Sequence, residues 1–380
     1  MRITDVEVIP LSFPVDKRSA RAFGLVKVST DGEVFGMGEM SDSYGHSNPL
    51  AGKEIVERAL RPLLMGRDPL KIEETCERLQ LHGASIGLEG LVIQAISGVE
   101  IALWDIAGKE LGKPVYELLG GTGPCRVKVY ASTTVPYPSE PADHARVARE
   151  QVERGFNAVK IRVGVNEEWD KEVVREVRDA VGPDVLVLVD VYMHYRLETA
   201  IKMAKEFEKY DIFFLEEPIP SYDVLGLARI ASEVEVPIAV GEHVFTRFGF
   251  ENLLARRAAD ILQPDCSVVG GLLEAKKVCE LAESHGVQCI PHSYNTIVNL
   301  VATMHLAASV NNCPMAELDV SPFNPLRDDL PLERIKADRG FVELPRRPGL
   351  GVELNDAVLR RYSYEGAKGL DMLTLPMERF

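Results

Sequence analysis

The sequence lacks several features that mark common classes of protein. No apolar run approaches the roughly 18 residues that a membrane span needs. The first residues, MRITDVEVIPLSF, lack the basic, apolar and small-residue succession of a signal peptide. Positive charge is in the minority, because 43 Lys and Arg stand against 58 Asp and Glu, a formal net charge of −15. These absences argue against a membrane protein and against a generic nucleic-acid binder, which needs a basic surface.

Cysteine pairs and a glycine-rich phosphate loop are also missing. No CxxC pair occurs, which argues against a structural zinc site and, without a signal peptide, predicts reduced thiols in a cytoplasmic protein. No GxGxxG follows a predicted strand, which weakens the case for an open dinucleotide-binding sheet. What remains is a 380-residue chain with 46% hydrophobic residues, ample for a large globular core.

The N-terminal third of the chain predicts a small α+β unit. Residues 3–11 and 25–39 alternate as strands do, with Asp31-Gly32 at a hairpin turn. We expect the basic stretch 13–24 between them to be a loop. From residue 53 to residue 118 the apolar residues recur at helical spacing.

Beyond this unit, short apolar runs alternate with amphipathic helical stretches. The runs are VKVYAST, AVKIRVG, VLVLVDV, IFFLEEP, PIAVGE, DILQPDC, QCIPHS and MAELDV. Near-continuous apolar strands suit a buried parallel sheet, and about eight strand–helix units in succession predict a barrel. An open Rossmann sheet is the second choice.

A charged or ionisable residue stands at the end of nearly every predicted barrel strand. In chain order these are Lys160 with Arg162, Asp190, Glu216 with Glu217, Glu242, Asp265, His292 and Glu317. From Lys160 onward they recur about every 23 to 30 residues, the length of one strand–helix unit. Each therefore occupies an equivalent place in its unit, and the carboxyl ends of barrel strands meet at one mouth. We expect the active site there.

Three of these residues predict a site for a hard cation. Asp190, Glu216 and Glu242 end consecutive strands, with no cysteine or HxH pattern beside them, which favours Mg²⁺. Any one of them alone is better explained as a solvated loop acid or a helix cap. Three at the same phase would repel one another, and a bound metal ion removes that repulsion.

Asp265 and His292 end adjacent predicted strands. A carboxylate bound to one imidazole nitrogen orients the ring and raises its basicity, which leaves the other nitrogen as a general base. A histidine without such a position is more often packed or at the surface, and this interpretation applies to His46, His82, His144, His285 and His305. His194 and His243 lie near the metal cluster in sequence and stay undecided.

The ordered motifs VKIR, LVD, LEEP, VGE, QPD, IPH and AELD resemble those of the enolase superfamily, mandelate racemase-like subgroup. ALWDIAGKELGKPVYELLGG and MGRDP near the start and PGLGVEL near the end extend the resemblance over nearly the whole chain. It implies a modified (β/α)7β TIM-like barrel over residues 123–350. It also implies an α+β capping domain over residues 1–122, joined by a C-terminal segment at about 351–380, and a homo-oligomer.

The resemblance also implies roles for the strand-end residues. The three carboxylates would hold Mg²⁺, with Glu217 behind them, and the His292–Asp265 pair would be the base. Glu317 would be a hydrogen-bond donor or acid beside the substrate carboxylate. The shared chemistry removes the proton α to a carboxylate, and Mg²⁺ with Lys160 stabilises the resulting enediolate.

Arg162 stands where many relatives have a second lysine that acts as a base on the opposite face of the substrate. A guanidinium has a pKa above about 12 and is a poor base, so only His292 is suited to shuttle a proton. This predicts a hydro-lyase, a dehydratase that converts an aldonate or aldarate to a 2-keto-3-deoxy acid. A racemase or epimerase of a 2-hydroxy acid or related carboxylate is the alternative, and a non-catalytic metal-stabilised binding protein is the third hypothesis.

Arg162 itself has two interpretations of equal weight, substrate binding or an ion pair with a metal-site carboxylate. Tyr192 replaces an asparagine that relatives often have there, and we expect it to donate a hydrogen bond or proton opposite His292. Substrate selectivity is expected in the cap loops and near the third strand. The candidates are Arg18, Arg21, Tyr44, His46, His82, Tyr192 and His194.

Overall fold

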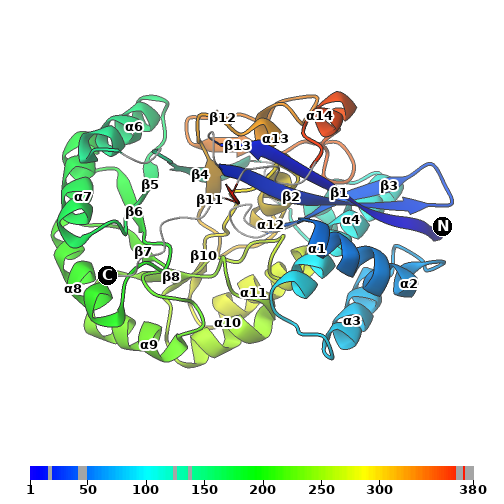
Figure 1. The fold of residues 1–380 in the computed structure, drawn as a ribbon, viewed down its shortest axis with the longest axis horizontal. Coiled ribbons are helices and arrows are strands. Elements are labelled where there is room, and N and C mark those ends of the chain that lie inside the picture. Colours follow the sequence, from blue (N-terminus) through cyan, green and yellow to red (C-terminus); the bar gives the residue numbers. More distant parts are fainter. Residues whose placement is uncertain (16–18, 42–48, 123–125, 136–138, 365–370, 373–380) are drawn as a thin grey trace.

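The computed structural model describes residues 1–15, 19–41, 49–122, 126–135, 139–364 and 371–372. Two β-sheets organise this part of the chain (Figure 1). The larger contains the barrel, and the smaller, built mainly from the N-terminal region, packs beside it. The α/β barrel with an added α+β unit predicted from the sequence is therefore confirmed.

Within the described residues, the barrel consists of eight parallel strands. They are β4 (Arg126–Ser132), β5 (Ala158–Arg162), β6 (Leu186–Asp190), β7 (Phe214–Glu216), β8 (Ile238–Val240), β9 (Ile261–Leu262), β10 (Gln288–Cys289) and β11 (Ala316–Asp319). Each strand from β4 to β9 pairs with the next, and β11 pairs with β4. The ring closes between β10 and β11, where the Glu317 amide donates to the Pro291 carbonyl.

In the described residues, an α-helix of ten or more residues follows each barrel strand except the last. These helices are α6 (Pro141–Glu153), α7 (Glu167–Val181), α8 (Leu197–Phe207), α9 (Val224–Glu233), α10 (Thr246–Ala255), α11 (Leu272–Ser284) and α12 (Ile297–Ala307). After β11 the chain forms the short helix α13 (Pro325–Asp328) and then the hairpin of β12 (Ala337–Asp338) and β13 (Phe341–Glu343). Strand β13 adds to the sheet antiparallel to β4, so the architecture is a modified (β/α)7β barrel.

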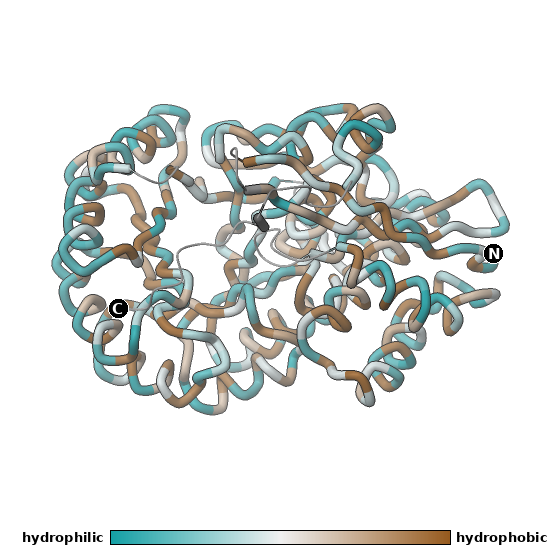
Figure 2. The backbone as a smooth tube through the Cα atoms, in the orientation of Figure 1, coloured by the Kyte–Doolittle hydropathy of each residue, from teal (hydrophilic) through white to brown (hydrophobic). Residues whose placement is uncertain are grey.

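The interior of the barrel is plugged by apolar side chains below the polar mouth. One such cluster draws a residue from each strand or its edge: Tyr130, Ala158, Leu188, Phe214, Ala239, Ile261, Ile290 and Met315. The hydrophobic colour follows the inner strands in Figure 2, while the outer helices carry most of the hydrophilic colour. The charged residues at the mouth therefore lie directly above apolar side chains. Lys160 Nζ, for example, lies 5.8 Å from the Tyr130 ring centre.

The N-terminal sheet contains β1 (Ile3–Pro14), β2 (Ser19–Thr30), β3 (Phe35–Met40) and β14 (Asp371–Met372). Around it lie α1 (Pro49–Glu54), the π-helix η1 (Ile55–Leu60), α2 (Arg61–Leu64), α3 (Ile72–Gly83), α4 (Leu91–Leu111) and α5 (Val115–Leu118).

The expectation of a loop over residues 13–24 was wrong. Phe13 pairs with Arg21 across β1 and β2, and Phe13, Ala22 and Phe23 are buried. These apolar side chains gain more from packing in extended strands than from exposure in a loop. Only residues 15–18 separate the two strands.

Helix α4 is the core helix of the cap. It is the one helix of the described ranges long and apolar enough to span a membrane, but 89% of its most apolar window is buried inside the protein. Strand β3 can approach it closely because Gly36 and Gly38 have no side chain. A Cβ atom on Gly38 would lie only 1.9 Å from the Gly98 carbonyl oxygen in α4.

The C-terminal tail returns to the N-terminal sheet after α14 (Asp356–Arg361). The Ser12 amide donates to the Tyr362 carbonyl, and the Tyr364 amide donates to the Pro10 carbonyl. Strand β14 pairs with β2. On these contacts we propose the division into a cap of residues 1–122 with the tail at about 351–380, and a barrel over residues 123–350.

We predict that Gly38→Ala lowers the free energy of unfolding by about 1–3 kcal/mol, because the added methyl group overpacks the contact between β3 and α4. Denaturant unfolding measures it. Gly32→Ala is the control, since a Cβ there meets its nearest neighbour, Thr30 Oγ1, at an ordinary 3.7 Å. Equal losses for the two variants would contradict the prediction.

Candidate active site

The strand-end residues predicted from the sequence meet at one end of the barrel. Strand register places Arg162 beside Asp190, and Asp190 beside Glu216. Most of the set is nearly inaccessible to solvent, with Asp190, Glu216 and Glu242 exposed by 2% or less. The structure therefore brings many ionisable groups into a small volume of low dielectric, where their interactions are strong.

Lys160 is the central cation of this cluster. Its Nζ lies 2.6 Å from Glu216 Oε1 and 2.9 Å from Glu317 Oε1. Asp190 Oδ2 is 3.7 Å away. Burial alone would lower the pKa of Lys160, but the carboxylates, Glu216 above all, outweigh it and raise the pKa well above its usual value. This environment favours the charged form of Lys160.

Arg162 adds a second positive charge at the rim. Its guanidinium NH1 lies 3.4 Å from Asp190 Oδ2, the ion-pair geometry that was one of its two expected roles. The same guanidinium sits 5.0 Å from the Tyr294 ring centre and 5.8 Å from that of Tyr192. It is thus held between two aromatic rings.

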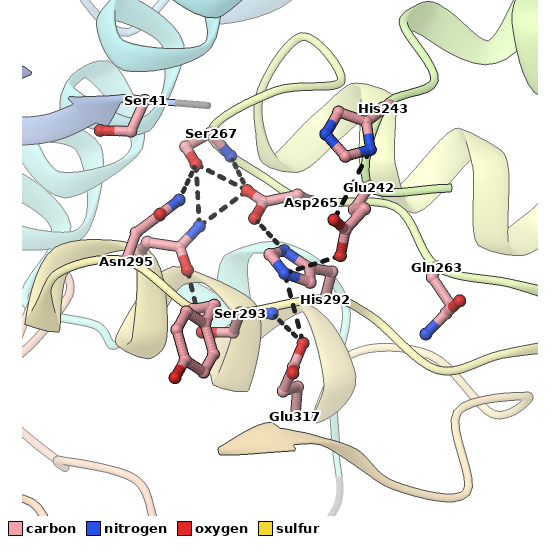
Figure 3. A network of polar contacts seen from close by, with 12 residues as sticks. Ser41, Glu242, His243, Gln263, Asp265, Ser267, His292, Ser293, Asn295 and Glu317 are labelled. Atoms are coloured by element: carbon pink, nitrogen blue, oxygen red, sulfur yellow. Dashed lines mark hydrogen bonds and ion pairs between the residues drawn. The ribbon is translucent and has the colours of Figure 1, made fainter. Parts of the chain in front are cut away.

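The His292 imidazole is held between carboxylates (Figure 3). Its Nδ1 lies 2.7 Å from Asp265 Oδ2, and both side chains are fully buried. Its Nε2 lies 3.0 Å from Glu242 Oε2 and 3.5 Å from Glu317 Oε2. Burial lowers the pKa of His292, but the negative charges of Glu242 and Glu317 overcome it and raise the pKa well above normal.

The pKa values of the carboxylates in the cluster shift in opposite directions. Burial is the main reason that the pKa of Glu216 rises to about 8, even beside Lys160. Burial also acts on Glu242, but His292 overrides it and holds the pKa of Glu242 well below its usual range. Gln263 Nε2 donates to Glu216 Oε2 at 2.7 Å. We had not predicted a role for Gln263, although its place two residues before Asp265 in QPD is a usable signal.

A group that could hold a metal ion lies at the same mouth. Within the described ranges, one set of three potential ligand atoms lies within 4.8 Å of one another, from Glu217, Glu242 and His243. It shares only Glu242 with the predicted trio, because Asp190 and Glu216 face Lys160. His243 Nδ1 lies 2.7 Å from Glu217 Oε2.

The donor set at this mouth fits a hard divalent cation. Buried carboxylate oxygens are costly without a partner. Two of them, Asp190 Oδ2 and Glu217 Oε1, receive no hydrogen bond from the described residues. Oxygen donors of this kind are the ligands that Mg²⁺ prefers, and a cation there would satisfy them.

Left-handed backbone turns the chain directly after two barrel strands. Tyr192 and Met193 follow β6 with φ of 49° and 65°, and Glu217 follows β7 with φ of 37°. Residues other than glycine adopt this conformation at some cost, and it concentrates at functional sites. None of these positions is a glycine, so the sequence contained no signal of a left-handed turn there.

The structure describes only some of the residues expected to select the substrate, and it places two of them, Arg21 and His82, outside loops. Arg18, Tyr44 and His46 lie outside the described residues. Arg21 lies within β2 rather than in a loop, is only 4% exposed, and donates from NH2 to the Tyr294 carbonyl. His82 is exposed in the last turn of helix α3, so its expected loop is not there.

Tyr192 and His194 are buried just beyond β6. The Tyr192 ring lies edge-on to the His243 ring, with centres 5.4 Å apart. Tyr192 therefore adjoins the cluster of Glu217, Glu242 and His243, and His194 lies beside Tyr192, with ring centres 6.1 Å apart. The roles of both residues stay a prediction.

Comparison with known proteins identifies the class of protein. Residues 1–120 match the family model for the mandelate racemase / muconate lactonizing enzyme N-terminal domain, and residues 143–358 match that for the enolase C-terminal domain-like family. The chain belongs to the mandelate racemase and muconate lactonizing enzyme group of the enolase superfamily.

Relatives with known names share most of the length of the chain. An arabinonate dehydratase of Saccharolobus solfataricus is 39% identical, over 88% of both chains. A D-galactarolactone cycloisomerase of Agrobacterium fabrum is 33% identical over 90% of this chain and 91% of the relative. A D-xylonate dehydratase of Haloferax volcanii is also 33% identical, over 90% and 85%.

A solved structure agrees with the fold. The structure of an enolase superfamily member from Polaromonas sp. JS666 superposes with a TM-score of 0.91 at 31% identity, covering 98% of this chain and 100% of that one.

We predict a pH-dependent stability contribution from the pair of His243 and Glu217 in EDTA-treated protein. Burial lowers the pKa of His243, but Glu217 outweighs it and raises the pKa to about 9 from 6.5. A raised pKa stabilises the folded protein fully below about pH 6.5, and the effect is lost as pH rises through about 9. His243→Asn should therefore cost about 2–3 kcal/mol near pH 6 and progressively less toward pH 10.

Denaturant unfolding at a series of pH values measures this difference. Glu217→Gln, which removes the other partner, should reproduce the same pH trend. A cost of His243→Asn that does not change between pH 6 and pH 10 would contradict the prediction.

Proposed function

We propose that the protein is a Mg²⁺-dependent sugar-acid dehydratase, a hydro-lyase that converts an aldonate or aldarate to a 2-keto-3-deoxy acid. The observation that carries this proposal is the asymmetry of the mouth. One buried His292–Asp265 pair can exchange a proton, whereas Arg162 stands where a second base would be needed. The dehydratase names of two relatives support the same reaction.

The metal would be held by Asp190, Glu216 and Glu242, with Glu217 and His243 as the adjoining donors. When bound, Mg²⁺ would act as a Lewis acid that stabilises negative charge developing on the substrate carboxylate. The mouth needs such positive charge, because its carboxylates outnumber Lys160 and Arg162. The same two cations supply the local attraction for an anionic substrate in a chain of net charge −15.

His292 acts as the base in this proposal, since a cation bound at Glu242 would offset the negative charge that raises the pKa of His292. Its Nε2 takes the proton α to the carboxylate, while Asp265 at Nδ1 fixes the ring and stabilises the imidazolium that forms. Lys160 stabilises the enediolate. The imidazolium then returns the proton to the departing β-hydroxyl as the C–O bond breaks, which releases water. The remaining enol tautomerises to the 2-keto-3-deoxy acid.

The expected role of Glu317, a hydrogen-bond donor or acid beside the substrate carboxylate, stays a prediction. Its Oε1 lies 2.9 Å from Lys160 Nζ and its Oε2 lies 3.5 Å from His292 Nε2. Burial alone would raise the pKa of Glu317, but Lys160 and His292 lower it. Its Oε2 accepts a hydrogen bond from the Ser293 amide at 3.1 Å. We therefore assign Glu317 to orienting Lys160 and His292.

We further propose a cytoplasmic homo-oligomer that acts on a small carboxylate, without nucleic acid or membrane. The free thiols support the reducing compartment, since the cysteines of the described ranges form no disulfide: Cys76, Cys266, Cys279, Cys289 and Cys313. The homo-oligomer rests on the family resemblance.

We predict that the purified protein with Mg²⁺ forms a 2-keto-3-deoxy acid from at least one member of a panel of aldonates and aldarates. EDTA should abolish product formation and added Mg²⁺ should restore it, because the substrate carboxylate would lose its main source of positive charge. Colorimetric detection of the keto acid with NMR of the product measures it. A panel that yields no keto acid with Mg²⁺ present would refute the proposed function.

We predict that His292→Asn lowers kcat by about 10²- to 10⁴-fold and abolishes deuterium exchange at the α carbon, because the base is lost. His285→Asn is the matched control, since this histidine is exposed at the end of α11. Arg162→Lys probes the racemase alternative. Exchange with inversion at the α carbon and no loss of water, increased in Arg162→Lys, would favour racemisation instead.

A further inference from the structure

A buried carboxylate of the cap reaches the barrel directly behind the proposed base. Glu39 of strand β3 is fully buried and receives hydrogen bonds from the first turn of helix α12. Its Oε2 accepts from the Thr296 hydroxyl at 2.6 Å and from the Asn299 amide at 2.8 Å. Its Oε1 accepts from the Thr296 amide at 3.2 Å. The carboxylate thus satisfies otherwise unpaired amides at this helix end.

Asn299 continues the contact into the active site. Its side-chain Nδ2 donates to Asp265 Oδ1 at 2.7 Å and to Ser267 Oγ at 2.9 Å. Its Oδ1 accepts from the Ser293 hydroxyl at 2.9 Å, which fixes the orientation of the amide. The main chain of Asn299 is therefore tied to the cap, and its side chain to the acid partner of His292.

Asp265 is held from both sides by this arrangement. Its Oδ1 accepts from the amide and the hydroxyl of Ser267, at 2.7 and 2.6 Å, in addition to Asn299. Its Oδ2 is left for His292 Nδ1 at 2.7 Å (Figure 3). A path of contacts therefore runs from Glu39 to the Asn299 amide, through the Asn299 side chain to Asp265, and from Asp265 to the imidazole.

A second cap carboxylate provides an internal control. Glu100 of helix α4 accepts hydrogen bonds from the Leu272 and Leu273 amides of helix α11, at 2.7 and 2.8 Å. It is equally buried, and burial raises the pKa of Glu100 and of Glu39 alike to about 7. Its remaining partner is Trp104 Nε1 of its own helix, so its contacts hold the cap to the barrel without reaching Asp265.

We propose that Glu39 is a positioning residue for the His292–Asp265 pair, acting through Asn299. The cap would then do more than cover the mouth, because one of its strands fixes the direction in which the base points. The catalytic consequence rests on the proposed dehydratase function, whereas the effect on the imidazole does not.

The test compares Glu39→Gln with Glu100→Gln in the full-length protein with Mg²⁺. Each variant replaces one buried carboxylate that accepts helix amides, so both should lower the melting temperature by a similar amount. Only Glu39→Gln should reduce kcat, by about 10- to 100-fold, with KM little changed, because a small misplacement of a catalytic group is costly. Glu100→Gln should keep the kcat of the unaltered enzyme.

The second readout is the NMR resonance of the His292 Nδ1–H proton in protein labelled with ¹⁵N-histidine, assigned by its absence in His292→Asn. It should move in Glu39→Gln and stay in place in Glu100→Gln. Asn299→Asp, which keeps an acceptable residue in the first turn of α12 but sets a carboxylate against Asp265, should move it as well. If Glu39→Gln does not fold, Thr296→Val takes its place, because it removes the hydroxyl that donates to Glu39 Oε2 without removing a contact of Asp265.

The outcomes separate the two proposals. If the unaltered enzyme dehydrates no sugar acid, the proposed function fails, and the His292 resonance still tests positioning. Equal losses of kcat in the two glutamine variants, or a His292 resonance that Glu39→Gln and Asn299→Asp leave unmoved, would overturn the positioning role.

Discussion

The mouth of the barrel depends on one buried ammonium group. Lys160 is inaccessible to solvent and lies between Glu216 and Glu317, with Asp190 slightly farther away. Removing a charge from water is costly unless opposite charges surround it. The carboxylates provide negative charge around Lys160, and Lys160 provides positive charge beside the carboxylates. Lys160 opposes the rise in pKa that burial imposes on Glu216 and on Glu317.

Buried charge is also compensated at the interface between the cap and the barrel. Glu39 and Glu100 are buried acids that would be costly alone, and the barrel helices α12 and α11 present unpaired amides that would be costly alone. Placing each carboxylate on a helix N-terminus satisfies both groups and suits the helix dipole. Gly38, the neighbour of Glu39 in β3, allows this strand to lie close to α4.

Much of the fold and of the proposed site could be predicted because both follow from local pattern. Eight apolar runs at regular spacing specify barrel strands, and parallel strands must deliver residues such as Asp190 and His292 to the same end. The contact of Glu39 with Thr296 joins residues 257 positions apart, with no shared motif to connect them. Arg21 was misplaced for a related reason, since strand pairing between β1 and β2 overrode its loop-like composition.

The contact between β3 and α12 also bears on how such a protein can change its substrate. Loops of a cap can vary in length and sequence without disturbing the strands behind them. Glu39 belongs to the cap in sequence, yet its hydrogen-bond partner Asn299 belongs to the barrel. A cap transplanted from a relative would therefore change two things at once: the loops over the mouth and the residue that supports the base. We expect a transplanted cap to keep the base in place only where the acid on β3 and the amide on α12 still meet.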